Sequence, residues 1–314
     1  MTGVRTQRRV SLRRALLPTL LTTLLTGSVL TACSSDDDAS PEAPVDAPVS
    51  GVSVTVDDTG DAPREPLVWF SDAGEKETVF RATQGWGQAT EGDGSDEGED
   101  DLPYDDVTME VPLTSSSSTD GNELEATVVA GRPTGDNTDG NDDLATAEGF
   151  TMNQKYNQDG RVTSRGFSAP EGASDAARSN VERSFTQMTD IPVVFPADDL
   201  GTGARWTVTG QVDDPMLGVS MRQGVTYTLL SREGSRIELD VDVERTPSVQ
   251  RMSGSDLTVT DSSSESNGNI TVDLRRPVPV SGMIETTTSV TYGETDSPVT
   301  VVQTSRTRSS WEPA

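Results

Sequence analysis

The chain has 314 residues, of which 52 are acidic and 24 are basic, so its formal net charge at pH 7 is −28. This charge argues against nucleic acid as a partner, because affinity for phosphates depends largely on lysine and arginine. One cysteine and no histidine argue against zinc, iron and copper sites and against histidine-based acid–base catalysis. We therefore expect no metal and no cofactor.

The first 32 residues have the layout of an export signal, with a basic cluster followed by an uncharged run and small residues. The cluster consists of Arg5, Arg8, Arg9, Arg13 and Arg14. The run ends in Leu30, Thr31, Ala32 and Cys33, which resemble the bacterial lipobox. That resemblance implies a signal peptide over residues 1–32, cleavage before Cys33, and a diacylglycerol with fatty acyl chains such as palmitate on the Cys33 thiol.

Two other interpretations of this segment are weaker. The 18 uncharged residues 15–32 approach the length of a transmembrane helix, but they include Pro18, Gly27 and Ser28. A buried structural cysteine is equally unsuited, because a serine and aspartate run follows Cys33. The export route stays open, since Arg13-Arg14-Ala15-Leu16-Leu17 fits a twin-arginine pattern that ordinary signals also contain.

Removal of residues 1–32 leaves 19 basic and 52 acidic side chains, a formal net charge of −33. Residues 33–50 then read as an acidic, proline-containing spacer that holds the folded part away from the membrane. The predicted location is therefore the extracytoplasmic face of the bacterial cell membrane. The membrane is an expected partner, reached through the lipid anchor, which holds the protein at the bilayer surface without spanning it. A protein or small-molecule partner stays open, because the sequence does not identify one.

In residues 51–170, apolar and polar residues alternate as in short strands, and polar loops interrupt the pattern. We expect strands at residues 52–56, 68–70, 78–81, 107–111, 124–128 and 150–152. The stretch 91–106 holds nine acids and no base, which is typical of a hydrated, disordered loop. A second polar loop is expected at 131–143. The Asp159-Gly160 pair predicts a tight hairpin turn before a strand at 161–163.

One helix is expected within residues 171–190, over about 175–188. Ser174 is a suitable N-cap, and Val181, Phe185 and Met188 lie on one face at helical spacing. In residues 191–314, apolar and polar residues again alternate as in strands. The predicted strands there include 206–208, 225–229, 237–243, 270–274, 284–292 and 299–304.

The fold class is therefore mainly β, α+β at most, with antiparallel sheets and one helix. No βαβ rhythm is present, which argues against a doubly wound nucleotide-binding fold. Similar hairpins at 107–125 and 225–238 suggest two related halves, 51–170 and 191–314, that form a sandwich or a curved half-barrel, although unrelated hairpin chemistry explains the match about as well.

Tests for familiar chemistry find no pattern that identifies a reaction. Neither Gly98 nor Gly140 can occupy the sixth position of an EF-hand loop with a glutamate at the twelfth. The Gly201-Thr202-Gly203 turn precedes a strand, whereas a phosphate cradle precedes a helix. No serine stands in a nucleophile motif. Pairs of carboxylates, as in glycosidases, stay open because their separation is spatial.

Residues 193–206, which run from Val193 through Pro196 and Gly201 to Trp206, resemble a segment of an uncharacterised family of bacterial β-rich lipoproteins. The similarity covers mainly residues 150–314, and it implies no catalytic or binding residue. Physically, the two glycines allow an unusual turn and Trp206 anchors it in the core.

We therefore expect a non-catalytic binding or structural module of the cell envelope. A carrier of a lipid or other hydrophobic ligand is the first alternative, and it requires a cavity within a curved sheet. A carboxylate-based hydrolase is the second alternative.

Overall fold

The fold was analysed in a computed structural model, which describes residues 43–72, 74–92, 102–121, 123–248, 251–252, 255–294 and 297–314. These residues belong to one compact unit. Within them, no helix is both long enough and apolar enough to cross a membrane. The lipobox residues Leu30, Thr31, Ala32 and Cys33, most of the spacer and much of the acidic loop lie outside the described residues.

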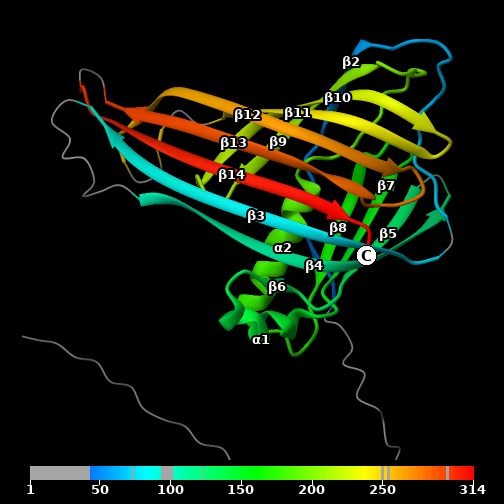
Figure 1. The fold of residues 1–314 in the computed structure, drawn as a ribbon, viewed down its shortest axis with the longest axis horizontal. Coiled ribbons are helices and arrows are strands. Elements are labelled where there is room, and N and C mark those ends of the chain that lie inside the picture. Colours follow the sequence, from blue (N-terminus) through cyan, green and yellow to red (C-terminus); the bar gives the residue numbers. More distant parts are fainter. Residues whose placement is uncertain are drawn as a thin grey trace, which may run out of the picture. The chain divides into compact units, whose positions relative to one another are not determined.

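The body is built on one antiparallel sheet of fourteen strands (Figure 1). In chain order the strands are β1 (Val45–Asp46), β2 (Ser53–Asp58), β3 (Lys76–Glu91), β4 (Leu102–Asp120), β5 (Glu123–Ala130), β6 (Thr134–Gly135), β7 (Thr151–Asn157), β8 (Val162–Ser168), β9 (Arg205–Asp214), β10 (Val219–Glu233), β11 (Arg236–Pro247), β12 (Thr258–Asp273), β13 (Ser281–Gly293) and β14 (Thr300–Glu312). The prediction of a mainly β, antiparallel fold is confirmed.

The strands follow the order β1-β8-β7-β5-β4-β3-β14-β13-β12-β11-β10-β9-β2, and β6 adds a short pairing to β4. Most neighbours are joined by hairpins, but the pairing of β3 with β14 connects the first third of the chain with its C-terminal strand. The sheet is therefore continuous from β1 to β2, with those two strands as its ends.

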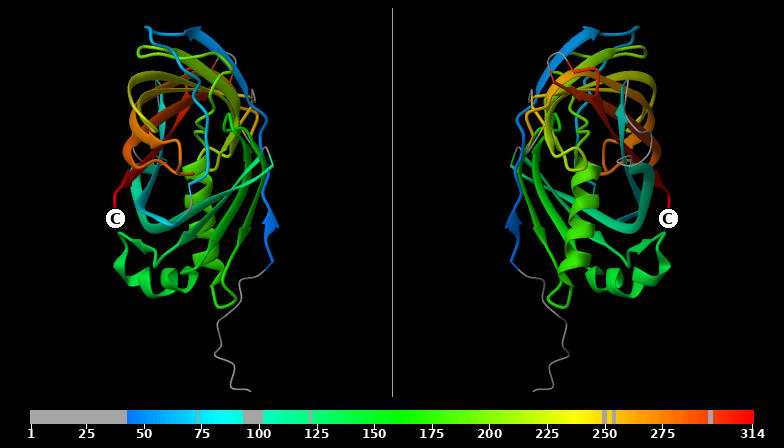
Figure 2. Two further views of the ribbon diagram at one scale, coloured as in Figure 1. Left: turned by 90° about the vertical axis from the view of Figure 1, so that its right-hand side faces the viewer. Right: turned by 90° about the vertical axis from the view of Figure 1, so that its left-hand side faces the viewer.

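The predicted helix is confirmed as α2 (Asp175–Thr189), which lies against the concave side of the curved sheet (Figure 2). Ser174 caps it, since its hydroxyl accepts a hydrogen bond from the Ala177 amide at 3.0 Å. Val181, Phe185 and Met188 are buried in the main core. α2 thus occupies part of the hollow of the curved sheet.

The segment between β1 and β2 spans the opening between the two ends of the sheet. β1 pairs with β8 and β2 pairs with β9, so the chain passes from one end of the sheet to the other within a few residues. We call residues 47–52 the strap; it is part of the blue segment along the side of the body in Figure 2. Its Ala47 amide donates a hydrogen bond to the Arg165 carbonyl oxygen at 2.9 Å.

The turn before β9 is anchored by Trp206, as the sequence predicted. The Trp206 side chain is fully buried, its Nε1 donates to the Val194 carbonyl oxygen at 2.9 Å, and its ring stacks on Tyr227 at 5.5 Å between centroids. Gly203 has a φ of +83°, and a Cβ atom on Gly201 would lie 1.7 Å from the Asp61 carbonyl oxygen. Glycine is therefore required at both positions for steric reasons.

Three sequence predictions are wrong. Residues 68–70 are not a strand. The Trp69 amide donates to the Gln158 carbonyl oxygen and the Phe70 amide to the Leu274 carbonyl oxygen. The segment therefore crosses the ends of other strands and does not pair along any one of them. Residues 102–106, placed in the acidic loop, begin β4. The loop at 131–143 contains β6, the short helix η1 (Thr138–Gly140) and most of α1 (Asn141–Leu144), and η2 (Ala145–Ala147) follows directly.

Candidate functional site

A band of buried polar side chains crosses the concave face of the sheet. On β13, Thr286 and Thr288 are buried between Ile284 of the main core and Val290 of a second, smaller apolar cluster. On β10, Gln223 lies likewise between Met221 and Val225. The other buried members of the band are Asp214, Arg245, Gln303 and Ser305, and the partly buried Gln84 adjoins them. Apolar residues at these positions would join the two clusters, so the band interrupts what would be one core.

Two adjoining cavities lie where this band meets the C-terminal end of α2. The first has a volume of about 450 Å³ and is lined by Arg165 of β8, Gln223, Asp190 and the strap. The second has a volume of about 320 Å³ and is lined by Asp190, Asp214 and Arg245 of β11. Asp190 is the C-cap of α2 and contributes to both walls. Both volumes fall within the range of about 300–1,000 Å³ that is usual for small-molecule sites.

The charged groups around Asp190 are held apart by neutral side chains. Arg245 is 6% exposed, and its Nε donates to Gln223 Oε1 at 2.9 Å. Gln223 in turn donates from its Nε2 to the Asp190 carbonyl oxygen at 2.7 Å. On the opposite side, Arg165 donates from Nε and Nη2 to Gln154 Oε1, both at 3.3 Å.

None of these charges forms an ion pair in the described part of the chain, where no carboxylate oxygen lies within 4.0 Å of an Arg165 or Arg245 nitrogen. The Asp190 carboxylate likewise has no arginine within that distance. Buried charges without partners destabilise a fold, and the usual protein solution is to pair them. Here each guanidinium donates to one glutamine side chain, and its remaining N–H donors have no acceptor in the described residues.

The electrostatic environment places Asp190 near its titration midpoint at mildly acidic pH. Burial raises the pKa of the Asp190 carboxyl to about 6, against the opposing effect of Arg245 and Arg165 and with a smaller contribution from Asp214 and Asp213. Burial also lowers the pKa of both guanidinium groups. Strongly shifted carboxyls in a cavity are typical of functional sites.

We expect the Asp190→Asn variant to be more stable than the wild type at pH 7.5, by about 2 to 3 kcal/mol, and similar to it near pH 4. A raised pKa means that the folded state holds the proton more tightly than the unfolded state. The Asp190 contribution to the free energy of unfolding therefore falls as the pH rises from about 4 to about 6, and asparagine removes that fall. Urea unfolding at both pH values measures it.

The control for this prediction is Asp256→Asn, which removes an exposed carboxylate whose side chain is 90% accessible. Its pH profile should match that of the wild type. Parallel profiles for Asp190→Asn and the wild type would show that Asp190 has no raised pKa in the folded protein.

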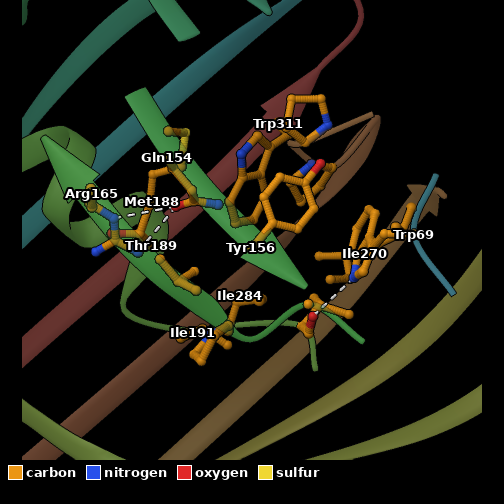
Figure 3. Close-up of a pocket in the computed structure, with 17 residues that line it drawn as sticks. Trp69, Gln154, Tyr156, Arg165, Met188, Thr189, Ile191, Ile270, Ile284 and Trp311 are labelled. Carbon is orange, nitrogen blue, oxygen red and sulfur yellow. Dashed lines mark hydrogen bonds between the residues drawn. The ribbon is translucent and has the colours of Figure 1, made fainter. Parts of the chain in front are cut away.

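A third cavity is apolar and much smaller. It lies beside α2 and holds about 80 Å³. Figure 3 shows Tyr156 and Trp311 at its centre, Trp69 on one side, and Arg165 with Gln154 on the other. The Trp311 indole nitrogen is buried without a hydrogen-bond partner. The volume is well below that of a usual ligand site, so α2 and its neighbours leave little room for an acyl chain.

Sequence reasoning named no residue of this polar site, although one signal was available. The alternation Ile237, Leu239, Val241 and Val243 predicts an inward-facing side chain at the next odd position, and that residue is Arg245. A charge on the buried side of a strand indicates a functional or structural polar site. In the described residues, no group of three or more acidic, histidine or cysteine side chains is arranged to hold a metal ion.

No protein-family model and no curated protein sequence matches this chain.

Proposed function

We propose that this protein is a lipid-anchored module of the bacterial cell envelope that binds a small polar ligand without transforming it. The observation that supports it best is the arrangement around Asp190, where the buried Arg245, the partly buried Arg165 and the partly buried Asp190 carboxylate line adjoining cavities without pairing. Unpaired charge away from water is costly to a fold, and a bound partner that pairs it would offset that cost.

Anchoring follows from the lipobox resemblance at Cys33 and the polar spacer after it. The strap begins at Ala47, 14 residues beyond Cys33 in the sequence, and it lines the larger polar cavity. The proposed membrane tether therefore leads into the segment that lines the proposed site. Binding is preferred to catalysis because the chain has no histidine and no serine nucleophile motif.

A carrier of a hydrophobic ligand is the second candidate, and the apolar cavity beside Trp311 is the observation that favours it. Its volume of about 80 Å³ is far smaller than either polar cavity, and the concave face is already covered by α2. A lipid would have to displace part of the core to bind there, at a cost in buried apolar contacts.

The test is to identify what the protein carries. The mature lipoprotein is purified from envelopes, denatured, and separated into aqueous and organic phases for mass spectrometry. We expect a near-stoichiometric polar molecule in the aqueous phase, lost from the Arg245→Gln variant but retained by Arg251→Gln, whose side chain is 66% accessible. A stoichiometric, non-covalent lipid would favour the carrier. Two results together would contradict both candidate functions. The purified protein would carry neither a polar molecule nor a lipid, and small molecules dialysed from an envelope extract would leave its melting temperature unchanged.

A further inference from the structure

The larger polar cavity and its neighbour present both signs of charge to a single bound molecule. Arg165 and Arg245 approach from β8 and β11, whereas Asp190 sits at the end of α2 and lines both cavities. Each arginine has at least one terminal nitrogen without an acceptor in the described structure. Arg165 lines the larger cavity and Arg245 the smaller one, and the two cavities share Asp190, so a ligand that spans them meets guanidinium donors and a carboxylate acceptor. A molecule that satisfies all of them must carry an anionic group and a cationic group.

We infer that the site binds a zwitterion of the amino acid or short-peptide class, with its ammonium group at Asp190 and its carboxylate at Arg165 and Arg245. This inference rests on the proposed function, because it names the ligand class of that binding site. Guanidinium groups are the best side-chain partners for carboxylates, with paired N–H donors that match the two oxygens.

A ligand with a single charge fits the surroundings less well. The two cavities together are lined by four carboxylates and four guanidinium groups, which are Glu182, Asp190, Asp213, Asp214, Arg161, Arg165, Arg183 and Arg245. This lining has no excess of positive charge to offer an anion, which would also have to approach a mature chain with a net charge of −33. A cation would leave the buried Arg245 without a counter-ion. A zwitterion has no net charge, so the negative protein does not repel it. Its two charged groups pair with the arginines and with the Asp190 carboxylate.

The strap forms part of the wall of the larger cavity. Its residues 47–52 all line that cavity, and the Ala47 amide donates to the Arg165 carbonyl oxygen at 2.9 Å. β1, which precedes the strap, contributes only two residue pairs to β8. A short edge pairing can open at low cost compared with a core strand, so a ligand can enter at this seam without disturbing α2.

The test is isothermal titration calorimetry on the mature protein at pH 7.5. The probes are the 20 common L-amino acids and L-alanyl-L-alanine, each compared with two derivatives: the N-acetylated acid, which lacks the ammonium, and the amide, which lacks the carboxylate. We expect at least one zwitterion to bind with a stoichiometry of one, and both of its derivatives to bind at least tenfold more weakly.

Variants connect the binding to the named residues. Asp190→Asn and Arg245→Gln should each weaken the best probe at least tenfold, whereas Asp256→Asn and Arg251→Gln, an exposed ion pair, should leave its affinity unchanged. Affinity should also fall as the pH drops from 7.5 to 5, because Asp190 becomes protonated around pH 6. Circular dichroism of each variant shows whether it is folded.

The outcomes separate this inference from the proposed function. Equal affinity for a zwitterion and for its acetylated or amidated derivative would overturn the zwitterion assignment and leave a site for a singly charged ligand. If no probe binds but a polar molecule co-purifies with the protein, the ligand class is wrong and the binding function stands. If no probe binds and nothing polar co-purifies, both fail.

Discussion

Replacement of Cys33 by serine is expected to move the protein from the membrane fraction to the soluble fraction or to leave it as the uncleaved precursor. Without the thiol no diacylglycerol can be attached, and on the proposed function the signal expected at residues 1–32 would then not be removed at that site. Each buried methylene contributes about 0.8 kcal/mol to membrane binding, and two or three acyl chains together hold a protein stably at a bilayer. The loss should therefore be nearly complete.

Fractionation, incorporation of labelled palmitate and intact mass measure this prediction together. Ser34→Ala is the matched control, since it changes the neighbouring residue and leaves the thiol in place. A Cys33→Ser protein with the wild-type mass and membrane partitioning would show that the segment before residue 33 is not a lipoprotein signal.

Replacement of Trp206 by alanine is expected to lower the free energy of unfolding by about 3 to 5 kcal/mol. The indole is fully buried, stacks on Tyr227 and also contacts Phe195 at 6.0 Å between ring centroids. Its Nε1 holds the turn at Val194 through a hydrogen bond. The substitution removes this contact area and leaves a cavity between the turn and β10.

Urea unfolding monitored by circular dichroism measures the effect. Trp206→Phe separates the two contributions, because phenylalanine keeps an aromatic contact with Tyr227 but loses the hydrogen bond to Val194, at a cost of about 1 to 2 kcal/mol. A Trp206→Ala variant within 1 kcal/mol of the wild type would contradict the role of this residue as the anchor of the turn.

Local features of the fold were predictable because local rules determine them. The alternation along β11, the Asp159-Gly160 turn and the Ser174 cap of α2 depend on residues close in sequence. The pairing of β3 with β14 joins distant segments, and no pattern in either strand indicates its partner. Residues 68–70 look like a strand because they are apolar, but they bury Trp69 by crossing strand ends.

The candidate site was not predictable for the same reason. Arg165, Asp190 and Arg245 come from β8, the end of α2 and β11, and only the tertiary fold brings them around two adjoining cavities. In the sequence they are three ordinary charges among 76. The one local signal was that Arg245 continues the inward-facing odd positions of β11. That pattern indicates a buried charge, but it does not indicate which groups lie opposite.

The central claim is that the charges around Asp190 serve a ligand and not the fold. The most direct measurement is the free energy of unfolding of the double variant Asp190→Asn with Arg245→Gln at pH 7.5, which removes one charge of each sign. We expect it to equal the wild-type value or exceed it by about 1 to 3 kcal/mol, because neither charge has an ion-pair partner to lose. A decrease of about 3 kcal/mol or more, as for the removal of an interaction that stabilises the core, would contradict the claim.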